Sequence, residues 1–154
     1  IRPIRPEDAT IEKAFVDRLS ERSRYLRFMQ PLVELTPEML SRFTQIDYDR
    51  EMALIAVVEE DGEEVQVGVA RYVMHPHRRG CEFAIAISDE WQGRGIATRL
   101  LESLIEVARD RRLKIMDGVV LRENRGMLKL AVRLGFRRES DPDDPDLVLL
   151  TLDL

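Results

Sequence analysis

The stretch 88–101 places two glycines, Gly93 and Gly95, directly before a leucine-rich helix pattern. Glycine allows the backbone to adopt a positive φ and to approach a ligand closely. The first backbone N–H groups of a helix have no partner within the helix, and the helix dipole favours negative charge there. Arg94 and Arg99 add positive charge at the same place. This combination predicts an anion site of the kind that holds phosphate, although a plain strand-to-helix turn also uses glycine.

Two common phosphate motifs do not fit this stretch. A P-loop needs Gly-Lys-Ser or Gly-Lys-Thr after a four-residue gap, and the chain holds no such run. The dinucleotide fingerprint GxGxxG needs a third glycine where this chain has Thr98, and it belongs to a parallel unit near the start of a fold. Here the preceding strands are expected to form a meander, so both motifs are excluded.

The elements that position this turn follow from the apolar pattern along the chain. Three β-type runs are separated by turn signals at Asp61-Gly62 and 75–80, which predicts an antiparallel meander. The expected order is a strand at 1–5, a helix from 6 to 19, an irregular segment at 20–32, a short helix at 36–43, strands at 52–60, 65–74 and 81–88, a helix at 96–112, a strand at 113–121, a helix at 124–134 and strands at 136–140 and 147–154.

This order predicts a mixed α/β (α+β) fold in a single domain over residues 1–154. We expect a twisted, mostly antiparallel sheet of about seven strands flanked by four helices, with helices on both faces. The helix at 96–112 connects the strands at 81–88 and 113–121, which are therefore expected to be parallel neighbours.

The composition restricts the class of protein. Of 154 residues, 44% are hydrophobic and 34% are charged, as in a soluble globular domain. Cys81 is the only cysteine, so no internal disulfide forms, which fits a reducing cytoplasm. A net charge of −5 argues against nucleic-acid binding, and no apolar run approaches the ~20 residues of a membrane span. Because the chain begins at Ile1 rather than Met, we expect it to be part of a longer protein with other domains.

Residues 92–97, Gln-Gly-Arg-Gly-Ile-Ala, resemble the Q/R-x-x-G-x-G/A pattern of the GNAT superfamily of acyl-CoA-dependent N-acetyltransferases. The pattern stands where that family places it, after the fourth strand and at the start of a long helix. A second match, at 124–136, resembles the family's helix that begins with asparagine and ends in Gly-Phe. Two matches in register, with the order of elements over the whole chain, resemble a GNAT fold in which the fourth and fifth strands are parallel.

The resemblance implies acetyl-CoA as co-substrate and no metal. It also implies that the backbone amides of 93–97 hold the CoA diphosphate, that Ala86 and Ile87 pair with the pantetheine arm like an added strand, and that Asn124 positions the cofactor or the acyl group. The residues it implies for the cofactor are Ala86, Ile87, Gln92, Gly93, Arg94, Gly95, Ile96, Ala97, Thr98 and Asn124.

A narrower resemblance is to the GNAT domain of bacterial protein lysine acetyltransferases of the Pat type. It rests on the stretches IRPIRPEDA, LSERSRYLRFM, FTQIDYDREMALIAV and EFAIAISDEWQGRGIATRLL. In that family the domain is often fused to an acyl-CoA-synthetase-like region. The resemblance implies acetyl transfer to lysines of other proteins, notably AMP-forming acyl-CoA synthetases. We expect a cytoplasmic protein with no nucleic-acid or membrane partner.

Direct transfer to an amine also needs a base. A lysine has a pKa of ~10.4, so at neutral pH a proton must leave before the nitrogen can attack. Glu82 is the main candidate, because it stands alone among apolar residues in CEFAIAI and because its position relative to Gln92 resembles that of the family's catalytic glutamate. The alternative is a solvated carboxylate on the polar face of a strand. Glu51, Asp47 and Asp49 are lesser candidates.

The leaving thiolate also needs a proton from a general acid. Many family members carry a tyrosine seven residues after the helix asparagine, and this chain has Ala131 there. Water, Tyr25 or Tyr72 remain as proton sources for the leaving thiolate. Two other functions therefore stay open: a small-molecule amine acetyltransferase and, because of Ala131, a regulatory domain that binds acyl-CoA without catalysis.

Two other features have simple structural explanations. Cys81 adjoins Glu82 but lacks a neighbouring histidine, so we expect a small strand residue rather than an acyl-accepting nucleophile. His75 and His77 lie on an expected turn, where two ligands make a poor metal site. We therefore expect neither residue type to take part in the chemistry.

Overall fold

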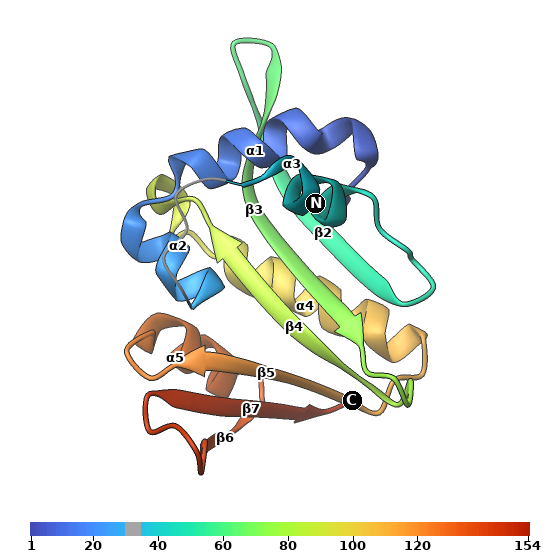
Figure 1. The fold of residues 1–154 in the computed structure, drawn as a ribbon, viewed down its shortest axis with the longest axis vertical. Coiled ribbons are helices and arrows are strands. Elements are labelled where there is room, and N and C mark those ends of the chain that lie inside the picture. The colour runs from blue at the N-terminus through green and yellow to red at the C-terminus, as the bar shows by residue number, and fades with distance from the viewer. Residues whose placement is uncertain (30–34) are drawn as a thin grey trace.

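A seven-stranded mixed sheet runs through the protein in the order β1-β2-β3-β4-β5-β7-β6 (Figure 1). The computed structural model describes residues 1–29 and 35–154. The strands are β1 (Arg2–Pro3), β2 (Glu51–Glu60), β3 (Glu63–Met74), β4 (Gly80–Ile87), β5 (Ile115–Leu121), β6 (Arg137–Ser140) and β7 (Leu147–Asp153). Among the described strands, β4 and β5 alone pair in parallel, so the expected mixed sheet and its parallel pair are confirmed.

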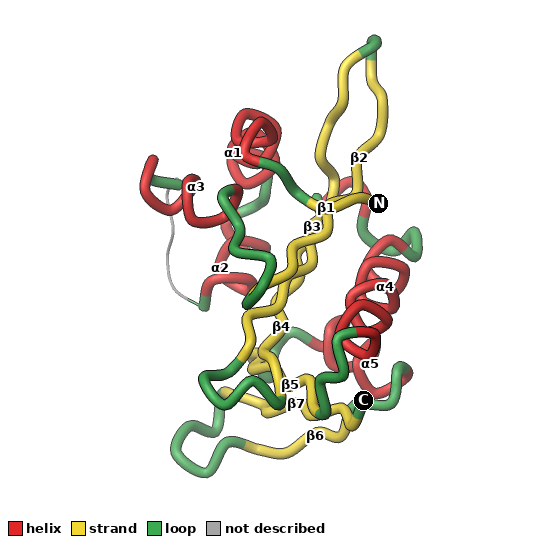
Figure 2. The backbone as a smooth tube through the Cα atoms, turned by 90° about the vertical axis from the view of Figure 1, so that its right-hand side faces the viewer, coloured by secondary structure: helices red, strands yellow, loops and turns green. Residues whose placement is uncertain are grey.

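Helices cover both faces of this sheet. They are η1 (Pro6–Asp8), α1 (Ala9–Arg18), α2 (Glu21–Phe28), α3 (Pro37–Thr44), η2 (Asp89–Trp91), α4 (Ile96–Asp110) and α5 (Arg125–Arg133). Figure 2 shows α1, α2 and α3 on one side of the strands and α4 and α5 on the other. This arrangement is the expected one, with helices on both faces.

The alternation of each strand divides the apolar side chains between two cores. Leu100 and Leu104 of α4 pack with Tyr72 and Met116 on one face of the sheet. Phe15 of α1 packs on the other face in a smaller cluster. Neighbouring residues of a strand therefore belong to different cores.

The β2–β3 hairpin turns at Asp61 and Gly62, as the sequence predicts. Their φ angles are 53° and 80°. A positive φ at both central residues is the backbone of the tight hairpin turn that Asp-Gly favours. The hairpin extends beyond the rest of the sheet (Figure 1).

Helix α2 corrects the sequence-based expectation. The segment 20–32 was expected to be irregular, but Glu21–Phe28 is helical, so the described residues form five α-helices rather than four. Residues 30–32 of that segment lie outside the described part of the chain. The helix was missed because it buries none of its residues completely and so lacks a strong apolar stripe.

Contacts at the start of α2 explain why it forms. The Ser20 hydroxyl accepts a hydrogen bond from Ser23 N at 3.0 Å and thereby caps the helix. The Asp89 carboxylate, which follows β4, accepts hydrogen bonds from Ser20 N at 3.0 Å and from the Ser23 hydroxyl at 2.9 Å. The helix is thus fixed to the far end of β4 by a residue distant in sequence.

Strands β4 and β5 separate soon after they meet. Their register covers only Gly80–Glu82 against Ile115–Asp117. The next residue of β4, Phe83, packs its ring on Gly118 of β5, where an added Cβ would lie 2.5 Å from the ring. Figure 1 shows the two strands diverging beyond this point. The glycine therefore makes room for the ring at the position where the sheet opens.

Candidate active site

The turn before α4 has the backbone expected of an anion site. Gly93 and Gly95 have φ angles of 76° and 84°, which non-glycine residues rarely adopt. No side chain in the described part of the chain caps the first turn of α4. An added Cβ at either glycine would meet no described atom within 4 Å. The glycines are therefore needed for their conformation, and the space in front of the amides is open.

This turn forms one wall of a cavity of about 670 Å³. The other walls come from the end of β4, the start of α5 and one side of α2. The cavity brings together Ala86, Ile87, Gln92, Gly93, Gly95, Ile96, Ala97, Thr98 and Asn124. All residues expected to contact the cofactor, apart from Arg94, thus line one space.

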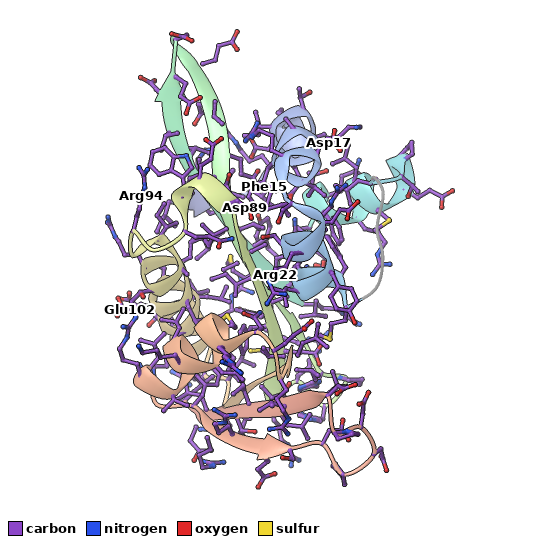
Figure 3. All side chains as sticks on the ribbon, turned by 90° about the vertical axis from the view of Figure 1, so that its left-hand side faces the viewer. Phe15, Asp17, Arg22, Asp89, Arg94 and Glu102 are labelled. Carbon is purple, nitrogen blue, oxygen red and sulfur yellow. The ribbon has the colours of Figure 1, made fainter. Side chains whose placement is uncertain are left out.

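Arg94 lies elsewhere. Its guanidinium stacks over the Trp91 ring, 4.6 Å from the ring centroid. Figure 3 shows Arg94 on the outer side of the turn, away from Arg22 of α2, which lines the cavity. Part of the positive charge in the cavity wall therefore comes from α2, a segment that the sequence analysis expected to be irregular.

Two polar residues of the cavity also hold the backbone in place. The Gln92 Nε2 donates a hydrogen bond to Ile87 O at 3.1 Å and so ties the turn to the end of β4. The Asn124 Oδ1 accepts a hydrogen bond from Met127 N at 3.3 Å and caps α5. These contacts give both residues a structural role at the cavity wall.

The edge of β4 beyond Glu82 completes the fit to CoA. Gly68 and Val69 of β3 pair with Ile87 and Ala86, whereas the described register of β4 with β5 ends at Glu82. Backbone groups of β4 thus face the opening, where the amides of a pantetheine arm would find partners. An uncapped helix start for the diphosphate and a free strand edge for the arm both match the expected ligand.

Glu82 lies in a second, smaller cavity of about 230 Å³. Its lining includes Glu51, Phe43, Tyr72 and Arg27. The Glu82 side chain is exposed, so it is accessible to an acceptor. Arg27 lines both cavities, which therefore share a wall at α2.

Of the three lesser carboxylate candidates, one lies near Glu82 and two do not. Glu51 lines the second cavity with Glu82. Asp47 and Asp49 are exposed and belong to a turn in which the Asp47 Oδ1 accepts a hydrogen bond from Asp49 N at 3.1 Å. Neither of these two aspartates lines the cavities described above.

A histidine and an aspartate flank Glu82 on the same face of the sheet. Asp117 is the register partner of Glu82, and its Oδ2 lies 2.7 Å from His75 Nε2. His77 stacks on His75 with the ring centroids 5.5 Å apart. Across residues 1–29 and 35–154, no three His, Cys, Asp or Glu side chains are arranged to hold a metal ion.

The remaining proton-transfer candidates differ in burial. Burial, with the nearby Asp117 carboxylate, raises the pKa of Cys81 to about 12, so this thiol stays protonated and is not a nucleophile. Ala131 is fully buried in the core. Tyr72 is also fully buried but reaches the second cavity, whereas Tyr25 is exposed and lines neither cavity.

Sequence reasoning missed the contribution of α2. Arg22, Ser23, Leu26 and Arg27 line the large cavity. The signal was present, since Ser20 followed by Glu21 is a typical helix start. Because the segment lacks an apolar stripe, it was nevertheless predicted to be irregular.

An opened mixed sheet with an uncapped, glycine-led helix at the opening is the architecture of an acyl-CoA-dependent acetyltransferase. Residues 17–136 match the acetyltransferase (GNAT) family. The chain is also 40% identical over 154 residues, covering 100% of this chain and 83% of the relative, to acetyltransferase PA5475 of Pseudomonas aeruginosa. The protein therefore belongs to the GNAT acetyltransferase family, whose members use acetyl-CoA.

Two further comparisons concern proteins named Pat. The GNAT domain of S. lividans PAT superposes with a TM-score of 0.89 at 29% identity, covering 99% of this chain and 89% of that chain. Acetyltransferase Pat of Mycolicibacterium smegmatis is 29% identical over 136 residues, which is 88% of this chain and 40% of that protein. None of the helices in the described residues is both long and apolar enough to cross a lipid bilayer.

Proposed function

We propose that this protein transfers the acetyl group of acetyl-CoA to the ε-amine of a lysine on another protein, with Glu82 as general base. The observation that carries the proposal is the pair of adjoining cavities. The larger is lined by the expected CoA residues apart from Arg94, and the smaller contains an accessible carboxylate. The donor and the acceptor would thus meet across the wall that the cavities share.

The chemistry follows from the residues of each cavity. The amides at the start of α4 and the free edge of β4 hold the CoA ester, while the acceptor amine enters beside Glu82. The Glu82 carboxylate takes a proton from the ammonium group, directly or through water. The neutral nitrogen then attacks the thioester carbon, the C–N bond forms, and the C–S bond breaks to release the CoA thiolate.

The source of the thiolate proton is a separate part of the proposal. A core alanine, Ala131, occupies the helix position where the resemblance led us to look for a tyrosine. Tyr72 is fully buried, and burial raises its pKa, which keeps the phenol protonated at neutral pH. We propose that the second proton of the attacking nitrogen passes to the CoA thiolate through water in the opening between β4 and β5, which leaves a neutral amide and the CoA thiol.

The acceptor is proposed from similarity and charge. The likeness to the GNAT domain of S. lividans PAT extends over 99% of this chain. The second cavity carries charges of both signs: the carboxylates of Glu51 and Glu82 would face a lysine ammonium, and the guanidinium groups of Arg27, Arg42 and Arg71 line the same space. We propose an AMP-forming acyl-CoA synthetase as the protein substrate. We also propose that the reaction takes place in the cytoplasm and that the protein has other domains.

The test of the base is the variant Glu82→Gln. We expect its turnover at neutral pH to fall by about 100-fold or more, because a general base contributes that much, while its affinity for CoA stays unchanged. Activity should recover as the pH approaches the lysine pKa of ~10.4, where the acceptor loses its own proton. Glu102→Gln, on the exposed face of α4 (Figure 3), is the matched control. Undiminished turnover by Glu82→Gln would exclude this role.

The test of the acceptor compares three amines under the same conditions. A folded AMP-forming acyl-CoA synthetase, the same protein after denaturation, and a polyamine are each incubated with acetyl-CoA, and acetylated product is measured by mass spectrometry. We expect product only with the folded protein. Preferred turnover of the polyamine would indicate a small-molecule acetyltransferase. CoA binding without product from any amine would indicate a regulatory domain.

A further inference from the structure

The wall between the two cavities contains a cation without a counter-ion. Arg27 of α2 lines both the large cavity and the cavity of Glu82. No carboxylate in residues 1–29 or 35–154 forms an ion pair with it, and this includes Glu51 and Glu82 in the second cavity. Arg27 is half-buried, and a guanidinium partly withdrawn from water normally has an anionic or hydrogen-bonding partner.

A column of alternating rings and guanidinium groups fixes the place of Arg27. Its guanidinium lies over the Phe28 ring, 4.7 Å from the centroid. Phe28 stacks on Phe43 with centroids 6.1 Å apart, and the Arg71 guanidinium lies 4.7 Å from the Phe43 centroid. Cations favour the faces of aromatic rings, so each end of this column holds one positive charge.

The two ends of the column differ in charge balance. The Arg71 Nη2 lies 2.8 Å from the Glu12 Oε2, and its Nη1 donates a hydrogen bond to Phe43 O at 2.7 Å. The second oxygen of Glu12 accepts from Gln66 Nε2 at 3.4 Å, so this carboxylate is already occupied. One buried carboxylate thus contacts Arg71 directly and attracts Arg27 only at longer range, so the donors of Arg27 remain for a ligand.

Arg27 stays protonated under working conditions. Burial, together with the nearby Arg71 guanidinium, lowers the pKa of Arg27 to about 10. At neutral pH the side chain is therefore still a cation. Its reduced hydration strengthens any charge-assisted hydrogen bond that it makes.

We infer that Arg27 binds a carboxylate of a substrate at the place where the acyl group meets the acceptor. A planar guanidinium recognises a carboxylate through two parallel hydrogen bonds. The carboxylate has two sources, the far end of a dicarboxylic acyl chain on CoA or an acidic group beside the acceptor amine. The inference rests on the CoA cavity of the proposed function, but it does not depend on lysine as the acceptor.

The acyl source is tested by binding alone. Titration calorimetry compares succinyl-CoA with butyryl-CoA, which has an acyl chain of the same carbon number without the carboxylate. If the acyl chain supplies the carboxylate, we expect wild-type protein to bind succinyl-CoA about tenfold more tightly, and Arg27→Gln to bind both esters equally. Arg109→Gln, an exposed position on α4 that lines neither cavity, should keep the preference.

The acceptor source is tested by kinetics with acetyl-CoA. Two lysine peptides that differ only by Glu or Gln next to the lysine are compared. If the acceptor supplies the carboxylate, we expect a KM about tenfold lower for the Glu peptide in the wild type, and equal KM values in Arg27→Gln. Arg27→Lys, which keeps the charge but loses the fork of donors, should retain part of the preference.

The outcomes decide between the two sources or reject both. If the wild type prefers the carboxylate-bearing member in only one pair, the two CoA esters or the two peptides, and Arg27→Gln removes that preference, the pair identifies the source of the carboxylate. Equal values for both pairs in the wild type, or preferences that Arg27→Gln leaves intact, would overturn the inference. If Arg27→Gln is unfolded by circular dichroism, the wild-type and Arg27→Lys measurements still decide. The calorimetry needs no transfer, so failure of lysine acetylation is recognised separately.

Discussion

Helices α4 and α5 begin at the same cavity, yet their first turns are completed differently. The Asn124 side chain caps α5 through a hydrogen bond of 3.3 Å from Met127 N. Ser20 and Thr36 cap α2 and α3 in the same way. Helix α4 begins at Gly95, and in the described residues no side chain takes that place. A cap satisfies the free amides from within the protein, so its omission at α4 leaves those amides for a ligand.

The largest expected effect comes from placing a charge at the uncapped turn. We expect Ala97→Glu to weaken CoA binding by about tenfold or more relative to Ala97→Gln, because the carboxylate takes the favourable place of the diphosphate at the helix start. The unfolding free energy of the Glu variant should be equal to or higher than that of the Gln variant, since the same dipole stabilises the new charge.

The matched pair Ala97→Glu and Ala97→Gln separates charge from bulk. Calorimetry measures CoA affinity, and urea denaturation measures the unfolding free energy. Raising the ionic strength should narrow the difference in affinity between the variants, because salt screens charge but not size. Equal affinities of both variants for CoA would show that α4 does not bind the anion.

A smaller effect is expected at the capped turn. Asn124→Ala should lower the unfolding free energy by about 1 kcal/mol, the typical value of a helix cap. Asn124→Asp keeps an acceptor oxygen and should lose little stability. Urea denaturation of both variants is the measurement. If Asn124→Ala loses more CoA affinity than Ala97→Glu, the start of α5 rather than the start of α4 would be the main binding site for CoA.

The smallest effect concerns the attachment of α2 to η2. Burial alone would raise the pKa of Asp89, but hydrogen bonds from Ser20 and Ser23 lower it below its ordinary value of 3.8. The charge of Asp89 therefore stabilises the fold above that value, and this contribution is lost as the pH falls through the folded-state pKa. The site is exposed to solvent, which limits its contribution.

We expect Asp89→Asn to be less stable than wild type by about 0.5 kcal/mol at neutral pH, because solvent screens this exposed network. The difference should begin to shrink as the pH falls below the ordinary carboxyl pKa of ~4 and should disappear only below the lowered folded-state pKa, where Asp89 of the folded wild type also loses its charge. Urea denaturation at several pH values measures it. A difference that persists in acid would mean that charge is not the cause.

The elements with strong periodicity could be predicted from the sequence. The apolar stripe of α4 includes Leu100, Leu101 and Leu104, all fully buried, and the period alone locates the helix. The Asp61-Gly62 turn was predicted because its backbone suits few other residues. Local chemistry determined both features.

The features that depend on distant contacts could not be predicted. Helix α2 is held by Asp89, and Arg27 is positioned by a ring column whose other half, Phe43 and Arg71, belongs to α3 and β3. No local pattern records such contacts. The sequence therefore predicted the residues that β4, α4 and α5 contribute to the candidate site, but not those that α2 contributes.

The contact between Phe83 and Gly118 lies where the two tasks of a transferase meet, the binding of the acyl donor and the binding of the acceptor. Phe83 belongs to the core shared with α4 and α5, whereas Glu82, one residue earlier, faces the opposite side of the sheet. The ring of Phe83 that packs on Gly118 thus also lines the cavity of Glu82, so the opening of the sheet and the shape of that cavity depend on the same side chain. The fold by itself does not fix the acceptor, since one scaffold can carry different side chains around the same opening.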